Sequence, residues 1–334
     1  MFNEFLDLVA ARYGIDPNVL RLGQSFNVNP TEAAELAGNI QQQSDFLSKI
    51  NVIGVVNVKG RKIFGATEKA ITGRKQNGRH LASIEASENT YELHETDTGV
   101  LIPWEYFDNL AGLGVDRLMA GIAQFVNQQT ALDMCQIGWF GERVSPTTSD
   151  KELKDVNIGW LKLLETKRPA NVYKGKGSSG QEKIKIYGAD AEFSCLDELA
   201  LDLRQGLDPR HQNRNDLVFL VGRELAAKES KIISKQHGLK PTERAALGSK
   251  TLLGSFGGME GLTPPNFPAK GAVVTTLENL SIYYQKTSVR RSLRNDEDKK
   301  GYVNSYYRNE GYVVEDYGLM TAIKADNVEF GEDE

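Results

Sequence analysis

The sequence predicts an α+β fold, in which helices and strands occupy separate stretches of the chain. The first observation is the stretch from Val115 to about Gly138, where apolar residues recur at helical spacing. The second is the run from Asp216 to Val221, which is apolar from its second residue on, as in strands buried on both faces. The third is the tail after Pro264-Pro265, which turns to β-branched and aromatic runs.

Composition excludes several classes of protein. The chain has 334 residues, with 40 Lys and Arg against 45 Asp and Glu and a net charge of −5, whereas a dedicated nucleic-acid-binding protein shows a basic excess. Apolar residues make up 40% and charged residues 25% of the chain, as in a globular protein with a buried core. No run approaches the ~20 apolar residues of a membrane helix. Cys135 and Cys195 form no CxxC pair, so we expect buried small side chains rather than reactive thiols, in a reducing compartment.

The amino-terminal stretch is predicted to be a string of short helices. An amphipathic helix from Phe2 to Tyr13 ends at Gly14, and Asp16-Pro17 and Asn29-Pro30 each place a capping residue before a helix-starting proline. The apolar face of the longer helix after Pro30 comprises Ala33, Ala37, Ile40 and Leu47. These helices have no core of their own, so they must pack on another part of the chain.

A long extended hairpin is predicted next. Val52–Val58 is rich in β-branched residues, and alternation resumes from Tyr91 towards Val100. Between them lies a glycine-rich basic stretch, and a loop of this length inside a compact domain would be unusual, so we expect it to reach outward to a contact. Its cations are Lys59, Arg61, Lys62, Lys69, Arg74, Lys75 and Arg79.

The composition of this basic loop narrows the classes of partner that it could contact. Lys and Arg could contact nucleic-acid phosphates, but Phe64 is the one aromatic residue of the stretch, so a base-stacking platform is missing. A solvated loop without a partner is the second possibility. We favour a third, a loop that docks on an acidic neighbour, because it suits a chain with a net charge of −5.

The remainder of the chain contains one long helix, a hinge and a second domain. Val115, Leu118, Met119, Ile122, Phe125, Val126 and Leu132 form the predicted apolar stripe of the long helix. Ser145–Asp150 is a polar loop or hinge, and a second domain is predicted from about Val156. Its helices are expected around Trp160, at Leu196–Leu203 and from Arg223. The tail is expected to hold strands at Ala272–Leu277, Leu280–Tyr284, Tyr302–Tyr307 and Gly311–Asp316.

The search for catalytic motifs identifies no catalytic, cofactor-binding or metal-binding residue. His94-Glu95 resembles the start of a zinc-protease HExxH motif, but Thr98 stands where the second histidine would be. Gly175–Ser178 has the composition of a phosphate-binding loop in the wrong order, and Gly112-Leu-Gly114 lacks the third glycine of a dinucleotide site. Asp296–Asp298 is better explained as a solvated turn than as a cation site.

Several blocks of the sequence identify a family. The chain closely resembles the major capsid protein of peduoviruses, the myophages with contractile tails. The blocks that carry the resemblance are Ser44–Leu47 with Ile50-Asn51, Asn157–Leu161, Asp216–Arg223, Leu277–Tyr284, Arg290-Arg291 and Tyr312–Tyr317. They occur in the family's order and cover nearly the whole chain.

The resemblance implies the Hong Kong 97-type phage capsid fold, an α+β architecture. Its parts are an amino-terminal arm, an extended β-hairpin loop, a peripheral domain with a long spine helix, and an axial domain. The implied bounds are 1–51 for the helical arm, 52–102 for the extended loop, 103–150 for the peripheral domain with the spine helix, 151–263 for the axial domain, and 264–334 for the return to the peripheral domain and the tail.

The resemblance also implies function and partners. We expect a virion protein that self-assembles into pentamers and hexamers of an icosahedral shell in the host bacterial cytoplasm, with no cofactor, no metal and no membrane association. A scaffolding protein, a protease and a portal protein would act with it, and the shell would enclose double-stranded DNA without sequence-specific binding. Family members lose an amino-terminal segment, which places a cut near Phe26 and Asn27. An encapsulin-type compartment of the same fold, and less so a hydrolase, are the alternatives.

Overall fold

The computed structural model describes residues 2–62, 72–81, 90–111, 114–174, 183–188, 191–236 and 254–331. The chain divides into two compact units. Unit 1 comprises Met1–Arg61, Thr90–Met134 and Ser281–Tyr312, and unit 2 comprises Lys62–Asn89, Cys135–Leu280 and Val313–Glu334.

Unit 1 combines five helices with a large sheet. The helices are α1 (Phe2–Tyr13), α2 (Pro17–Arg21), α3 (Pro30–Gln41), α4 (Trp104–Ala111) and most of α5 (Val115–Phe140). The strands are β1 (Phe26–Asn27), β2 (Asn51–Val55), β3 (Lys59–Arg61), β4 (Thr90–Glu92), β5 (His94–Pro103), β12 (Leu280–Gln285), β13 (Arg290–Asp296) and β14 (Gly301–Val314).

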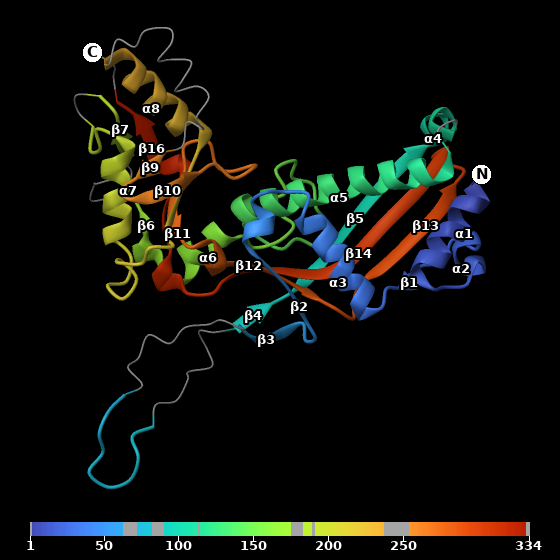
Figure 1. Ribbon diagram of the computed structural model, residues 1–334, viewed down its shortest axis with the longest axis horizontal. Coiled ribbons are helices and arrows are strands. Elements are labelled where there is room, and N and C mark those ends of the chain that lie inside the picture. Colours follow the sequence, from blue (N-terminus) through green and yellow to red (C-terminus); the bar gives the residue numbers. More distant parts are fainter. Residues whose placement is uncertain are drawn as a thin grey trace. The chain divides into compact units, whose positions relative to one another are not determined.

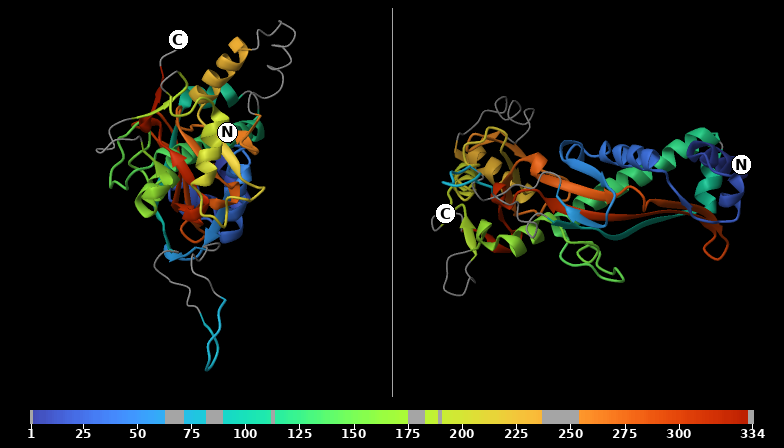
Figure 2. Two further views of the ribbon diagram at one scale, coloured as in Figure 1. Left: turned by 90° about the vertical axis from the view of Figure 1, so that its left-hand side faces the viewer. Right: turned by 90° about the horizontal axis from the view of Figure 1, so that it is seen from below.

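The sheet of unit 1 has the order β1-β13-β14-β12-β2, and β5 also pairs with β14. β14 pairs antiparallel with both β13 and β5, while β2 joins β12 in parallel. The long helix α5 runs along this sheet (Figure 1 and Figure 2). The prediction of two strands after Tyr302 is wrong, since one strand continues from Gly301 to Val314. Arg308 and Glu310 resemble a polar break in the sequence, but both side chains are buried and paired with each other.

The capped helices of the amino terminus are confirmed. Asp16 Oδ1 accepts the backbone N–H of Asn18 at 2.9 Å, and Asn29 Oδ1 accepts the N–H groups of the first turn of α3 at 3.1 and 3.0 Å. Leu47 is buried but lies in a separate 3₁₀ turn, because α3 ends at Gln41.

The amino-terminal helix α1 packs on later parts of the chain, α4 and β14, as expected. The ring of Phe2 stacks on that of Tyr302 at a centroid distance of 3.8 Å, and the ring of Phe107 lies edge-on to both, 6.0 Å from Phe2 and 4.8 Å from Tyr302. Offset and edge-on aromatic pairs add about 0.5–1.5 kcal/mol to the area that they bury. α1 is therefore held on unit 1 by an aromatic cluster on α4 and β14.

Unit 2 surrounds a second sheet. Its helices are α6 (Trp160–Lys167), α7 (Leu196–Gln205), α8 (Arg223–Gln236) and the end of α5. Its strands are β6 (Val172–Tyr173), β7 (Ile184–Ile186), β8 (Val218–Val221), β9 (Ser255–Phe256), β10 (Met259–Leu262), β11 (Ala272–Thr275), β15 (Thr321–Ile323) and β16 (Val328–Phe330).

The core of unit 2 forms around β8. The sheet order is β6-β15-β11-β8-β10-β9, and every residue of β8 is buried, which confirms the prediction of a strand covered on both faces. The apolar face of α7 packs with β8 and β11 in one core cluster. The indole rings of Trp139 and Trp160 meet edge-on at 4.8 Å where α5 enters the unit. In the described part of the chain, no helix is both long and apolar enough to cross a bilayer.

Candidate assembly surfaces

The base of the predicted basic loop is a two-stranded ribbon of β3 and β4. Lys59 pairs with Glu92 across the ribbon, with Nζ 2.6 Å from Oε1, and this hydrogen bond lowers the pKa of the Glu92 carboxyl. The hydroxyl of Tyr91 donates to the carbonyl of Asn57 at 3.2 Å. Arg61 is exposed at the end of β3. The loop therefore starts from fixed backbone.

The described tip of the loop, residues 72–81, is exposed throughout and carries Arg74, Lys75 and Arg79. Gly78 has a φ of +92°, which few residues other than glycine adopt, so the turn at the tip depends on it. Lys69 and Phe64 lie outside the described residues, as do Gly175–Ser178 and Gly112-Leu113.

Lys62 differs from the other described cations of the loop, because its side chain is buried. Its Nζ donates a hydrogen bond of 2.7 Å to the carbonyl of Val314 and lies 4.0 Å from the centre of the Tyr317 ring. Burial lowers the pKa of Lys62 to about 8, although Glu315 and Asp316 act to raise it. Sequence reasoning missed this contact, since the residues that meet are about 250 positions apart.

The predicted cleavage residues, Phe26 and Asn27, form strand β1. They pair antiparallel with Arg291 and Arg290 of β13, and the side chain of Phe26 is buried while that of Asn27 is exposed. Arg291 Nη1 also donates to the hydroxyl of Tyr13 at 2.5 Å. The peptide bond between the two residues therefore lies in hydrogen-bonded structure rather than in an open linker.

An apolar groove of about 520 Å³ lies between α5, β5 and α4 in unit 1. Phe125, predicted to face the core, is 61% exposed at its edge, and Leu101 and Tyr106 are also exposed there. That part of the predicted stripe is wrong, while Leu118, Ile122 and Val126 are buried. Exposed apolar surface of this kind is characteristic of protein interfaces.

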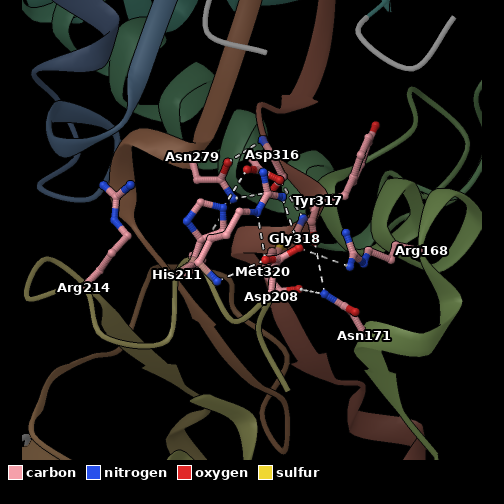
Figure 3. A network of polar contacts seen from close by, with 12 residues as sticks. Arg168, Asn171, Asp208, His211, Arg214, Asn279, Asp316, Tyr317, Gly318 and Met320 are labelled. Atoms are coloured by element: carbon pink, nitrogen blue, oxygen red, sulfur yellow. Dashed lines mark hydrogen bonds and ion pairs between the residues drawn. The ribbon is translucent and has the colours of Figure 1, made fainter. Parts of the chain in front are cut away.

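A network of polar contacts surrounds the 3₁₀ turn Tyr317–Leu319 in unit 2 (Figure 3). His211 Nε2 lies 2.9 Å from Asp316 Oδ2, and the other oxygen of that carboxylate accepts the N–H of Gly318 at 2.7 Å. Asn279 brackets the backbone of Asp316, accepting its N–H at 2.7 Å and donating to its carbonyl at 3.0 Å.

The second half of the network fixes the same turn from the opposite side. The amide of Asn171 donates to the carbonyls of Tyr317 at 3.1 Å and of Met320 at 2.8 Å. Hydrogen bonds from Arg210 lower the pKa of Asp208 to about 2. These groups bind backbone and one another, which is the arrangement of a structural network rather than of a catalytic site.

Groups of metal-ligating side chains and the two cysteines are the remaining candidates for chemistry. Over the residues that the structure describes, no group of three or more His, Cys, Asp or Glu side chains is placed to hold a metal ion. Cys135 is buried and Cys195 partly buried. The backbone N–H of Lys299 donates to Asp296 Oδ1 at 3.1 Å, as in a turn.

Comparison with known proteins decides the family. A family model described as the phage major capsid protein of the P2 family matches residues 1–326. The chain belongs to this family of phage major capsid proteins. The capsid protein is 30% identical over 332 residues to the protein described as "Capsid proteins" in Escherichia phage P2, covering 95% of this chain and 90% of the relative. It is 24% identical to the major capsid protein of Serratia phage KSP20, covering 100% of this chain and 97% of that relative.

A solved structure confirms the fold of the capsid protein. It is similar to a chain of the satellite phage P4 procapsid, a structure that includes the size determination (Sid) protein, with a TM-score of 0.78 and 27% identity. The match covers 94% of this chain and 96% of that chain. The α+β, Hong Kong 97-type fold expected from the resemblance is therefore confirmed. Members of the family are structural components of the virion and not enzymes.

Proposed function

We propose that this capsid protein assembles in the cytoplasm of a host bacterium as pentamers and hexamers that close into the icosahedral head of a tailed phage. The observation that carries the proposal is the family match over residues 1–326 together with the similarity to a procapsid chain. The shell would enclose double-stranded DNA without sequence-specific binding, in keeping with the net charge of −5. The same matches favour a phage head over an encapsulin-type compartment.

The basic tip would be the intersubunit contact of this shell. Arg74, Lys75 and Arg79 are exposed on a loop whose base is fixed by the β3–β4 ribbon. One exposed ion pair contributes only ~0–1 kcal/mol. Contacts of this strength can still decide assembly when they are repeated at every boundary of a closed shell.

The segment up to Phe26 would be an assembly aid that a phage protease removes at Phe26-Asn27. A scaffolding protein would act alongside that protease, and a portal protein would occupy one vertex. Helix α1 suits a segment that can be removed, because it contacts the rest of unit 1 through a small aromatic cluster and is separated from α2 by Gly14. Intact-mass measurement of mature particles tests the cut, and a mature shell that retained Met1 would contradict it.

The proposed role of the tip as an intersubunit contact is tested by removing its positive charge. The triple variant Arg74→Gln/Lys75→Gln/Arg79→Gln should fold normally by circular dichroism but form few or no closed particles in negative-stain electron microscopy. The matched control, Arg74→Lys/Arg79→Lys, keeps the charge and should assemble as the wild type does. The wild type should also assemble less at high salt, since exposed pairs are screened. Normal closed shells from the triple variant would refute the contact.

A further inference from the structure

The amino-terminal segment, residues 2–26, is held on unit 1 by contacts that do not depend on its covalent link to the rest of the chain. Its most deeply enclosed apolar side chains are those of Phe5, Leu6, Ala10 and Leu20. The rings of Phe2 and Phe5 meet the ring of Phe107 on α4, at centroid distances of 6.0 and 5.9 Å. A cut after residue 26 leaves these contacts in place. Release of the segment is therefore a separate step that follows the cut.

A pocket of about 300 Å³ lies along the boundary between this segment and the rest of unit 1. Tyr13 and Phe26 line it from the segment, and Ile102, Ile122 and Arg291 line it from the rest of the unit. The rings of Tyr13 and Phe26 are 5.3 Å apart, and the guanidinium carbon of Arg291 lies 5.5 Å from the centre of the Tyr13 ring. The pocket therefore combines apolar walls with a guanidinium.

The guanidinium of Arg291 has no carboxylate partner among the residues that the structure describes. It is half-buried and donates to two neutral groups, the hydroxyl of Tyr13 at 2.5 Å and Oδ1 of Asn304 at 3.2 Å. Arg12, the other arginine that lines the pocket, has a carboxylate oxygen of Glu35 at 4.0 Å. A guanidinium carries five N–H donors in a fork that matches a carboxylate. Arg291 therefore keeps the capacity to bind an anion.

The proposed cut creates such an anion next to Arg291. Hydrolysis adds one water molecule across the Phe26-Asn27 peptide bond, and it leaves a carboxylate on Phe26 and an amino group on Asn27. Phe26 stands directly opposite Arg291 in the register of β1 with β13. Residues opposite each other in an antiparallel pair have their side chains on the same face of the sheet. The carboxylate forms on this backbone, and the pocket gives it room to turn towards the guanidinium.

We propose that unit 1 is a receptor for its own cut segment, and that Arg291 binds the carboxylate that the cut creates on Phe26. The inference rests on the proposed cut at Phe26-Asn27. The ligand is a helical peptide with an apolar face and with a free carboxylate on an aromatic last residue. Bound in this way, the segment leaves slowly after the cut, so that it covers β13 and α4 for longer than the covalent link lasts.

The experiment starts from the state after the cut and needs no protease. Residues 1–26 and 27–334 are expressed together as two chains, so that every residue of the protein is present. The bound segment is exchanged for a fluorescent synthetic copy that ends in either a carboxylate or a carboxamide. Fluorescence anisotropy then follows its release into an excess of unlabelled segment. The carboxylate form should leave about tenfold more slowly, because hydrogen bonds between charged partners are the stronger ones.

Two variants of the long chain assign this difference to Arg291. Arg291→Gln should release the carboxylate and carboxamide forms at the same fast rate, because it removes the cation but keeps a hydrogen-bond donor. Arg291→Lys keeps a cation without the fork geometry and should preserve only part of the difference. If Arg291→Gln does not fold, Arg291→Lys still decides, since a reduced difference is expected there as well.

Three results would overturn the inference. Equal release of the two forms from the wild-type chain would show that the carboxylate is not bound. A full difference that persists in the Arg291 variants would show that the new amino terminus of the long chain binds the carboxylate instead. Two chains that form no folded complex would refute the receptor itself. The proposed cut fails separately, by the intact mass of an uncut chain in mature particles, because the split chain contains no peptide bond to be cut there.

Discussion

Arg308 and Glu310 form an ion pair that is completely enclosed in the sheet of unit 1. Their side chains are 2% and 0% exposed, and Arg308 Nε donates to Glu310 Oε2 at 2.5 Å. Arg308 also donates to Thr98 Oγ1 at 3.0 Å and lies 4.8 Å from the Tyr306 ring, while the hydroxyl of Tyr312 donates to Glu310 Oε1 at 3.1 Å. The pair lies at the point where the sequence suggested that β14 would break.

Glu310→Gln is the informative perturbation. It keeps the size of the side chain but leaves the guanidinium buried without its counter-charge, and breaking a buried pair in this way costs about 3–5 kcal/mol. Arg308→Met/Glu310→Leu removes both charges and leaves the half-buried hydroxyl of Thr98 and the buried hydroxyl of Tyr312 short of a partner, at about 1–3 kcal/mol in total. The double variant should therefore be more stable than the single variant by about 2 kcal/mol.

The assay is urea unfolding in the background of the triple tip variant, which is expected not to assemble, because assembly would otherwise stabilise the folded chain by mass action. The unfolding midpoint and slope give the free energy of each variant. The single variants Arg308→Met and Glu310→Leu complete the double-mutant cycle with Arg308→Met/Glu310→Leu, and a strongly favourable coupling is expected. A Glu310→Gln chain within about 1 kcal/mol of the wild type, or additive single effects, would refute the reasoning.

Three further predictions follow from the packing and electrostatics. Gly138→Ala on α5 should destabilise unit 2, because the added Cβ would overlap the buried indole ring of Trp160 on α6. Gly121→Ala on the same helix meets nothing within 4 Å and should raise the free energy of unfolding by up to about 1 kcal/mol. Calorimetry of the two variants tests this contrast. Phe2→Ala and Tyr302→Ala should each loosen α1, read out as faster backbone hydrogen exchange in residues 2–13 with unchanged exchange in β8. Since its pKa is depressed to about 2, Asp208 adds stability above about pH 4 that disappears as the pH falls towards 2, and Asp208→Asn should flatten this part of the acid unfolding curve.

Local chemistry explains what the sequence could predict. The Asp16 and Asn29 caps, the spacing of α5 and the apolar run of β8 each act within a few residues, and each predicted element is present. Strand β13 was missed because all of its residues except Leu293 are charged or polar, and it is stabilised by its neighbours in the sheet. Phe125 was assigned to the core because it is apolar and falls at helical spacing, but its side chain is exposed. Helical spacing does not show how wide a face of the helix its neighbours cover.

Long-range contacts explain what the sequence could not predict. The partners in the polar network are up to 149 positions apart, and no short motif links Asn171 to the turn at Met320. The same holds for the burial of Lys62, which reads as one more cation in a basic stretch. Family resemblance identified the fold, but the individual contacts of these side chains required the three-dimensional arrangement.

The pairing of β1 with β13 would control when the proposed cut at Phe26-Asn27 takes place. A protease could reach this peptide bond only while the two-residue strand is detached, so the rate of processing would be the fraction of time that β1 spends detached multiplied by the rate of cutting. A short edge strand opens by local fluctuation, well below the cost of global unfolding. A contact in the growing shell that displaces the amino-terminal helices would detach β1 more often and advance the cut, whereas one that holds them in place would delay it. The moment of maturation would then be set by the mechanics of the substrate rather than by the abundance of the protease.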